Sequence, residues 1–183
     1  MFNRLVAFIL IVIFSPILLF SSLAIIIEDG FPVFFTQKRV GINYTYFNIF
    51  KFRSMKNDTP NVATHLLTNP EKYLLKIGKF LRKTSLDELP NLINIIKGEM
   101  VFVGPRPALF NQVDLMILRV AIGVDKLKPG ITGWAQINGR DDISIEKKVQ
   151  LDQEYLHKKS FLFDMQIIIK TFTNVLFSRG VSH

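Results

Sequence analysis

The chain has 183 residues, a formal net charge of +8 and no cysteine. The lack of cysteine excludes disulfides, thiolate zinc sites, a cysteine nucleophile and palmitoylation, and the basic charge favours an anionic partner: phospholipid headgroups, nucleic acid or a phosphorylated substrate. After an apolar segment at the N-terminus, about 155 residues remain, enough for one globular domain with a modest core. The histidines lack metal-ligand spacing, which favours surface or structural roles for His65, His157 and His183.

The apolar segment covers residues 5–27 without a charge, and Ser15 and Pro16 stand at its midpoint. Because proline lacks the N–H that a helix interior requires and its ring clashes with the preceding turn, we expect a bend between Phe14 and Pro16. Each arm is then about 16 to 18 Å long, roughly half of the hydrocarbon core of about 30 Å. The sequence therefore predicts a re-entrant membrane helix over residues 1–27 that turns at Ser15 and Pro16.

Two other interpretations of this segment stay open. A straight transmembrane helix tolerates proline where neighbouring groups, including Ser and Thr side chains, satisfy the freed backbone carbonyls. A secretory signal peptide would have a shorter apolar region and a small-residue cleavage site. Arg4 is the sole basic residue before Lys38, and many follow, so charge places a domain of residues 28–183 in the cytoplasm.

The rest of the chain alternates short strands and helices, which indicates an α/β fold that is mostly helical. Aromatic and β-branched residues in segments 31–36 and 44–52 flank a turn at Gly41 and predict a β-hairpin. A polar loop is expected over residues 57–70, and a short buried strand over residues 100–103. Helices are expected over residues 71–83, 92–97, 108–120, 145–157 (with Ser144 as N-cap) and 161–177.

Two of these helices have features that suit a membrane interface. In the first, lysines recur at helical spacing and form either a solvated face or a contact with anionic lipid: Lys72, Lys76, Lys79 and Lys83. The last helix is apolar over much of its surface and either packs in the core or lies in the interface. The predicted fold is a re-entrant helix followed by a small globular domain with interfacial amphipathic helices.

Residues 82–91 carry the clearest chemistry. Ser85 and Glu88 have capping-box spacing, whereas Pro90 would sit more easily if Asp87 were itself the N-cap. Either register puts Asp87 and Glu88 in the first helical turn, where the helix dipole favours ionised carboxylates and attracts phosphate. An ionised Asp can attack phosphorus and a neighbouring Glu can hold Mg²⁺, although capping alone is the simpler interpretation of such a pair.

Two further segments are suited to ligand contact. Pro105 and Pro107 restrict the backbone on both sides of Arg106, which preorganises its guanidinium for a phosphate, or simply makes a rigid turn. Residues 128–140 place three glycines around Trp134, the only tryptophan, in a loop that could approach a ligand closely; structural turns use glycine as well.

These segments, in this order and after a helix broken at Ser15 and Pro16, resemble the small monotopic phosphoglycosyl transferases of the bacterial sugar transferase family. The resemblance runs along nearly the whole chain. It is carried by residues 34–41, 50–55, 84–91, 98–100, 103–107, 130–140, Leu151, Asp152, Tyr155 and 161–171. Val101 departs from the family pattern, in which a Ser usually follows the Met.

The resemblance implies transfer of a sugar 1-phosphate from a UDP-sugar to polyprenol (undecaprenyl) phosphate, with release of UMP, through a covalent phosphosugar on the Asp of an Asp-Glu dyad. It assigns Asp87 as the nucleophile and Glu88 as the Mg²⁺ ligand, with Asp87 beside the metal. By position, the candidates for diphosphate or nucleotide contacts are Lys51, Arg53, Arg82, Arg106 and Arg140.

The resemblance also implies a location and partners. We expect the bacterial inner membrane with the catalytic domain in the cytoplasm, a role in initiating surface glycan assembly, and an N-acetylated, often 6-deoxy, amino sugar as the donated group. A homodimer is compatible with this expectation. The rival classes are a membrane-anchored scaffold or lipid-binding protein without catalysis and a nucleic-acid binder. No recognised nucleic-acid motif accompanies the dispersed basic residues, so no nucleic-acid partner is expected.

Overall fold

The computed structural model describes residues 1–60, 69–139 and 143–176. Within this part of the chain, helices predominate and the strands form two sheets of two strands each. This confirms the prediction of a mostly helical α/β fold with short strands and a long apolar N-terminal helix. His65, His183, Arg140 and the expected end of the last helix at residue 177 lie outside the described residues, as do positions 61–68 of the predicted loop.

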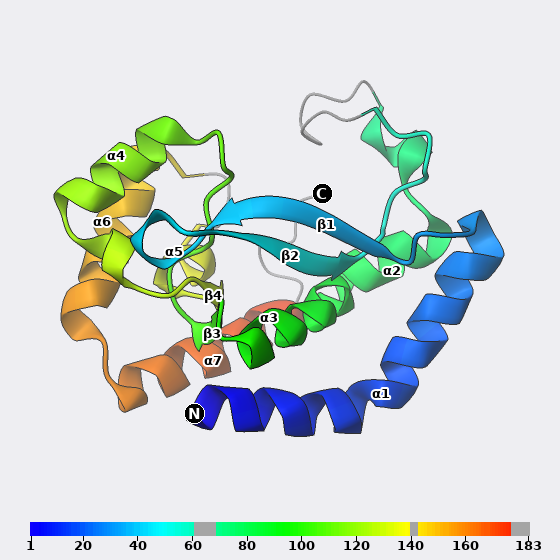
Figure 1. The fold of residues 1–183 in the computed structure, drawn as a ribbon, viewed down its shortest axis with the longest axis horizontal. Helices are drawn as coiled ribbons and strands as arrows, with labels where there is room; N and C mark the ends of the chain where they lie inside the picture. Colours follow the sequence, from blue (N-terminus) through cyan, green and yellow to red (C-terminus); the bar gives the residue numbers. More distant parts are fainter. Residues whose placement is uncertain (61–68, 140–142, 177–183) are drawn as a thin grey trace.

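The N-terminal segment forms one helix, α1 (Phe2–Asp29), with Pro16 inside it. Figure 1 shows α1 as two arms joined by a bend. Pro16 cannot donate to the carbonyl of Val12, one turn earlier, and the hydroxyl of Ser15 donates to that oxygen at 2.7 Å instead. The expected bend is therefore present, and Ser15 satisfies the carbonyl that the proline frees.

Most of α1 lies outside the core of the protein. It is long and apolar enough to cross a membrane, and only 11% of its most apolar window is buried. Ala7, Ser21 and Ile25 face the domain, whereas large apolar side chains on both arms are exposed, among them Leu5, Phe8, Ile13, Leu19, Phe20 and Leu23. Exposed apolar surface on this scale is consistent with membrane association.

A β-hairpin follows α1. Strands β1 (Phe34–Val40) and β2 (Tyr46–Phe52) pair antiparallel, with Phe34 opposite Phe52 and Val40 opposite Tyr46. The hairpin was predicted, but β1 starts later and runs longer than residues 31–36. It starts after Pro32, which has no N–H for a ladder, and it continues until Val40 donates to the carbonyl of Ala108.

The predicted helix over residues 71–83 is divided. A 3₁₀ turn, η3 (Pro70–Tyr73), is followed by extended Leu74, which pairs with Met55, and only then by α2 (Lys76–Lys83). The first N–H groups of α2 belong to Lys76 and Ile77, and both donate to the carboxylate of Glu28 at the end of α1, at 2.6 and 3.1 Å. This long-range cap sets the start of α2.

The centre of the domain holds a second, parallel strand pair, β3 (Val101–Val103) with β4 (Gly130–Thr132). Strand β3 was expected, and β4 was not. Helix α3 (Leu92–Lys97) ends at Gly98, as predicted, where φ is 85°. Helix α4 (Val113–Ala121) starts later than expected because residues 108 and 109 pair with β1.

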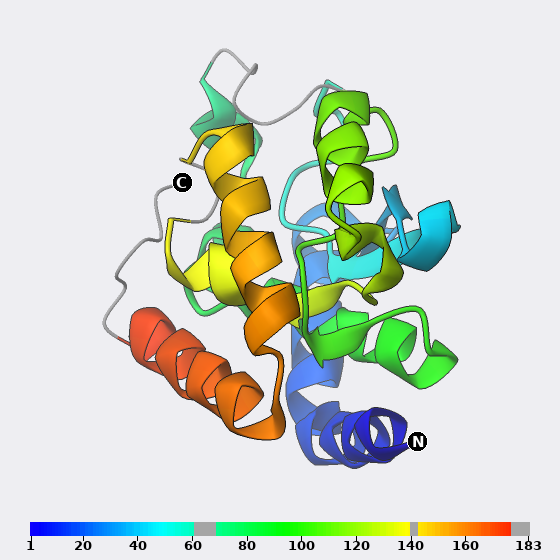
Figure 2. The ribbon, with the colours of Figure 1, turned by 90° about the vertical axis from the view of Figure 1, so that its left-hand side faces the viewer.

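The remaining helices are α5 (Trp134–Ile137), α6 (Ile145–Lys158) and α7 (Phe161–Leu176). Ser144 caps α6 as predicted, since its hydroxyl accepts from the N–H of Lys147 at 3.2 Å. Figures 1 and 2 show α7 and the first arm of α1 on the same side of the molecule, away from the hairpin. Helix α7 buries Ile167 and exposes Phe161, Leu162, Ile169 and Phe172.

Candidate functional site

The acidic pair lies at the start of a 3₁₀ helix, η4 (Leu86–Asn91), which leads directly into α3. Asp87 and Glu88 occupy its first turn, as predicted. Neither of the two capping registers left open by the sequence forms: η4 starts after Ser85, so Asp87 is not the N-cap, and Ser85 has a left-handed backbone with φ 57° and makes no side-chain cap bond. The capping box does not form because the carboxylate of Glu88 turns toward cations from other segments.

Glu88 connects three elements of the fold. Its Oε1 lies 2.6 Å from Nζ of Lys51, on β2, and 3.8 Å from Nη1 of Arg106, in the loop after β3. The Lys51 and Glu88 side chains are 18% and 23% exposed, so solvent screens this ion pair less than it screens a surface pair. The structure thus brings together Lys51, Glu88 and Arg106, which are far apart in the sequence.

Asp87 has a strongly perturbed acidity. The pKa of Asp87 is raised from its ordinary value of 3.8 to about 6, chiefly by burial and in part by the charge of Glu88, while Lys51 and Arg82 oppose the rise. A carboxyl group with a pKa near 6 is mostly ionised at neutral pH and is more basic than an exposed aspartate. Such a perturbation beside a second carboxylate and two cations favours a chemical role.

Arg82, on α2, supplies a cation next to Asp87. Its Nε donates to the hydroxyl of Ser54 at 2.9 Å, which holds the side chain in place. Burial lowers the pKa of Arg82 and the charge of Asp87 raises it again, so the two groups interact electrostatically. An arginine remains charged at neutral pH even with a lowered pKa.

A pocket adjoins the acidic pair. Its polar side chains come from Arg39, Lys51, Glu88, Asn91 and Arg106, and the rest of the lining is apolar. The full lining comprises Arg39, Ile49, Lys51, Glu88, Asn91, Met100, Arg106, Pro107, Gly130 and Ile131. Cations around a carboxylate on a partly apolar wall suit a phosphorylated ligand, because they neutralise a charge that would otherwise repel the carboxylate.

Four consecutive backbone carbonyls in the loop that carries Arg106 accept hydrogen bonds. The oxygens of Pro105, Arg106, Pro107 and Ala108 accept from Gly130 N–H, Arg119 Nη1, Arg39 Nη1 and Val40 N–H, at 3.0, 2.9, 3.0 and 3.0 Å. The predicted rigid backbone around Arg106 is thereby confirmed. Pro105 and Pro107 restrict the backbone dihedral angles, and the four hydrogen bonds hold the loop against its neighbours.

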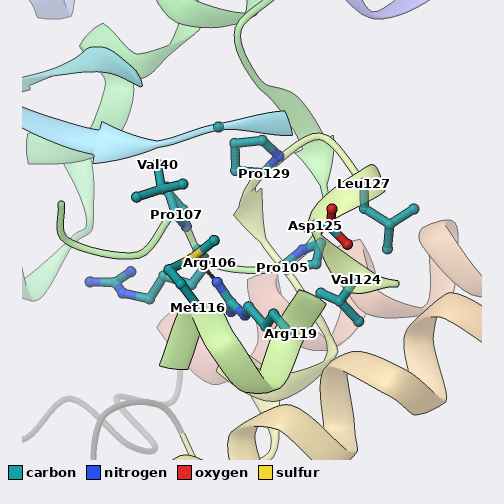
Figure 3. Close-up of a pocket in the computed structure, with 11 residues that line it drawn as sticks. Val40, Pro105, Arg106, Pro107, Met116, Arg119, Val124, Asp125, Leu127 and Pro129 are labelled. Atoms are coloured by element: carbon teal, nitrogen blue, oxygen red, sulfur yellow. Dashed lines mark hydrogen bonds between the residues drawn. The ribbon is translucent and has the colours of Figure 1, made fainter. Parts of the chain in front are cut away.

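A second pocket, drawn in Figure 3, lies on the other side of this loop. Arg106 and Pro107 line both pockets, and Arg119 and Asp125 supply further charged groups here. Arg119 is 5% exposed and its Nε and Nη2 donate to Oδ2 of Asp152, on α6, at 3.0 and 2.6 Å. Arg119, which lines the second pocket, therefore supports the Arg106 loop through its buried ion pair with Asp152.

Sequence reasoning missed this support. Asp152 and Tyr155 belong to the segments that carry the family resemblance, yet no role followed for them, and Arg119 sits in a predicted amphipathic helix. Tyr155 is 1% exposed, and its hydroxyl contacts the carbonyl of Val103 at 3.0 Å and the carboxylate of Asp164 at 2.8 Å. The signal available in the sequence was that Asp152 and Tyr155, two polar residues, lie three positions apart on the apolar face of a helix, where they need buried partners.

Arg53 occupies a different environment from the other candidates. It is 6% exposed, and all three of its guanidinium nitrogens bond to the end of α1 and its neighbourhood. The partners are the Asp29 carboxylate and the carbonyls of Asp29, Gly30, Pro32 and Met55. The structure therefore places Arg53 at the end of α1, with its guanidinium bonded there and not to Asp87 or Glu88 among the described residues.

Asp87 and Glu88 are the carboxylates of the candidate site that could hold a metal. No group of three His, Asp or Glu side chains close enough to hold a metal occurs within residues 1–60, 69–139 and 143–176. Mg²⁺ is commonly held by one or two carboxylates together with substrate phosphate oxygens and water. Asp87 and Glu88 fit that mode of binding, which completes the metal's coordination with the substrate.

Comparisons with known proteins identify the family of this chain. The family model described as "Bacterial sugar transferase" matches residues 1–178. The "Uncharacterized sugar transferase EpsL" of Bacillus subtilis (strain 168) is 41% identical over 181 residues, which are 99% of this chain and 88% of that protein. The "Undecaprenyl-phosphate glucose phosphotransferase" of Komagataeibacter xylinus is 38% identical over 98% of this chain, but 36% of its own length.

A third relative is also longer than this chain. The "UDP-glucose:undecaprenyl-phosphate glucose-1-phosphate transferase" of Escherichia coli (strain K12) is 39% identical over 90% of this chain and 37% of its own length. The chain thus spans a little over one third of the length of these two longer relatives. The resemblance predicted from the ordered motifs is confirmed, and the chain belongs to the bacterial sugar transferase family.

Proposed function

We propose that this protein transfers a sugar 1-phosphate from a UDP-sugar to undecaprenyl phosphate, releases UMP, and so initiates assembly of an extracellular polysaccharide. Two relatives carry names that state such a transfer of glucose 1-phosphate or glucose to this lipid. The observation that carries the proposal is the Asp87–Glu88 pair, surrounded by Lys51, Arg82 and Arg106 from three other segments.

The proposed chemistry takes two displacements at one phosphorus atom. A carboxylate oxygen of Asp87 attacks the phosphorus that bears the sugar, the P–O bond to the uridine phosphate breaks, and UMP leaves with the electron pair. A phosphate oxygen of undecaprenyl phosphate then attacks the same phosphorus and displaces Asp87, which regains its carboxylate. A covalent intermediate of this kind lets a soluble donor and a lipid acceptor use one site in turn.

The cations have separate parts in this proposal. Lys51 and Arg106, both paired with Glu88, lie where the diphosphate would bind, and Arg106 is held by a loop that cannot easily move. Arg82 lies beside Asp87 and stabilises its ionised form. Mg²⁺, when bound by Glu88 and Asp87, supplies further neutralisation of phosphate charge. Arg140 keeps its proposed nucleotide contact, whereas we assign Arg53 to anchoring α1.

We further propose that α1 is re-entrant and that the domain faces the cytoplasm of the bacterial inner membrane. The bend at Pro16, the Ser15 bond across it and the exposed apolar side chains on both arms support this topology. Exposed Phe161, Leu162 and Phe172 on α7, on the same side as the first arm, would add an interfacial contact. A domain seated this low meets a lipid phosphate without extracting the lipid.

A UMP-release assay tests the proposed function. The purified full chain in detergent or nanodiscs is incubated with undecaprenyl phosphate, Mg²⁺ and a panel of UDP-sugars that includes UDP-glucose and N-acetylated amino sugars. We expect UMP release with at least one donor and a phosphosugar adduct on Asp87 that mass spectrometry detects when the lipid is omitted. Equal UMP release by Asp87→Asn would refute the covalent route, and a protein inactive with every donor would favour the scaffold alternative.

A further inference from the structure

Asn91 is a buried polar residue whose acceptor has no partner. It closes η4, it is 3% exposed, and its Oδ1 is buried without a hydrogen bond in the described structure. More than nine in ten buried polar groups in native proteins are hydrogen-bonded, and each exception calls for an explanation. A buried acceptor left unpaired destabilises the fold, so its retention points to a use.

Asn94, one turn later, shows what a structural asparagine looks like in the same region. It is fully buried, its Oδ1 accepts from Phe50 N–H at 3.1 Å, and its Nδ2 donates to the Asn48 carbonyl and the Glu99 carboxylate, both at 2.7 Å. Asn94 thus satisfies both ends of its amide by joining α3 to β2. Asn91 makes no such connection.

The position of Asn91 explains the difference. Side chains three residues apart eclipse one another on a 3₁₀ helix, so Asn91 follows Glu88 on the same face of η4. Both residues line the pocket that also contains Lys51 and Arg106. Asn91 therefore lies in the wall of the pocket beside the acidic pair, where a ligand rather than the protein can supply the partner of Oδ1.

We propose that Asn91 binds the donor substrate, with Oδ1 accepting a hydrogen bond from a neutral O–H or N–H group of the UDP-sugar. The inference rests on the proposed function and adds a residue that recognises the substrate without reacting. An ionised phosphate offers acceptors only, so it cannot satisfy Oδ1. The remaining donors on a UDP-sugar are the sugar hydroxyls, an acetamido N–H, the ribose hydroxyls and the uracil N–H.

Such a contact contributes to selectivity. A site built to pair with a substrate O–H or N–H discriminates against analogues that lack the group, because binding them leaves the buried acceptor unpaired. Lys51 and Arg106 attract any sugar diphosphate alike, whereas Asn91 distinguishes ligands by a neutral donor. Asn91 is therefore a specificity residue that recognises a neutral O–H or N–H group of the UDP-sugar.

Asn91→Leu tests this, because leucine has a similar size and no polar atom. Isothermal titration of the full chain in nanodiscs measures the Kd of the UDP-sugar that supports turnover, or of UDP-glucose, and the Kd of UMP. Thermal unfolding measures Tm without ligand. We expect Asn91→Leu to weaken UDP-sugar binding by about tenfold, the value of one hydrogen bond, while Tm stays equal or rises. Asn91→Ala should weaken binding similarly.

The UMP measurement shows whether the hydrogen-bond donor belongs to the sugar or to the uridine. If UMP binding is unchanged, the group lies on the sugar; if UMP binding weakens equally, it lies on the uridine. Asn94→Leu is the matched control and should lower Tm, since it removes three hydrogen bonds. UDP-sugar binding within twofold of wild type, or a Tm lowered as far as in Asn94→Leu, would overturn the role of Asn91. Because binding is scored apart from turnover, an inactive wild type would refute the proposed function without deciding this point.

Discussion

Arg119 donates from Nη1 to the backbone carbonyl of Arg106 at 2.9 Å, and the same guanidinium is paired with Asp152. A buried ion pair between α4 and α6 therefore fixes the loop that presents Arg106 to Glu88. Ion pairs of this kind add little net stability compared with well-packed apolar residues, although breaking one side is costly. The pair is better explained by the geometry that it imposes on Arg106.

This explanation predicts different results for single and double variants. Arg119→Met leaves Asp152 buried and unpaired and should cost about 3–5 kcal/mol of unfolding free energy. Arg119→Met with Asp152→Leu removes both charges and should recover most of that stability. The double variant should still lose about tenfold in kcat/KM for the UDP-sugar, because the Arg106 carbonyl has lost a hydrogen bond. Denaturant unfolding and UMP release measure the two quantities; wild-type kcat/KM in a stable double variant would contradict the positioning role.

Asp87→Asn should abolish UMP release and the covalent adduct without unfolding the protein. Burial favours the neutral form of Asp87, as its raised pKa shows, so the ionised group destabilises the fold at neutral pH. The amide removes this charge, and we expect the unfolding free energy to rise by about 1–2 kcal/mol after allowance for solvent screening. Thermal unfolding at pH 7.5 checks this, with Asp114→Asn on α4 as an exposed control. A marked fall in stability would show that the carboxylate is needed for the fold.

The activity should depend on pH through the same group. Because only the ionised Asp87 attacks phosphorus and its pKa is about 6, kcat/KM should fall about tenfold per pH unit below 6 and level off above 7. The effect on stability has the opposite direction. The folded pKa lies above the ordinary 3.8, so stability from this group is fully present below about pH 3.8 and is lost as pH rises through 6. A kcat/KM profile that stays flat down to pH 5 would show that the pKa of Asp87 in the free enzyme is not raised.

The bend in α1 should control topology. Ser15→Ala with Pro16→Ala restores the helix N–H, and a straight segment of about 35 Å is long enough to cross the hydrocarbon core. A single cysteine at Asn3, in a chain that otherwise has none, should resist a membrane-impermeant thiol reagent in intact cells when α1 is bent. In the double variant it should react in a measurable fraction of molecules, with loss of activity. Strong labelling of the parent would show that α1 spans the membrane.

The sequence predicts most of what depends on neighbouring residues. Pro16 indicates the bend, Gly98 the end of α3 and Ser144 the cap of α6, and both registers considered for η4 place Asp87 and Glu88 in its first turn. These features depend on local backbone chemistry, which a sequence displays directly.

Features that depend on long-range contacts were not predictable in the same way. Arg53 sits in a basic segment suited to phosphate, yet residues about the end of α1 occupy all of its nitrogens. Arg119 and Asp152 are 33 positions apart, and nothing in either helix alone indicates their pairing. Strand β4 has three residues and exists because β3 offers a parallel partner. Each depends on tertiary neighbours that periodicity does not specify.

The end of α1 is fastened to the domain at two points, by Glu28 to the start of α2 and by Asp29 to Arg53. Helix α2 also carries Arg82, whose charge acts on Asp87. In the topology proposed above, these contacts connect α1 to the acidic pair, so the depth at which α1 settles fixes the height of Asp87 above the lipid surface. Bilayer thickness should therefore affect catalysis. In vesicles made from lipids of graded acyl-chain length, the turnover of undecaprenyl phosphate should be highest at one chain length, whereas the affinity for the UDP-sugar should not depend on chain length.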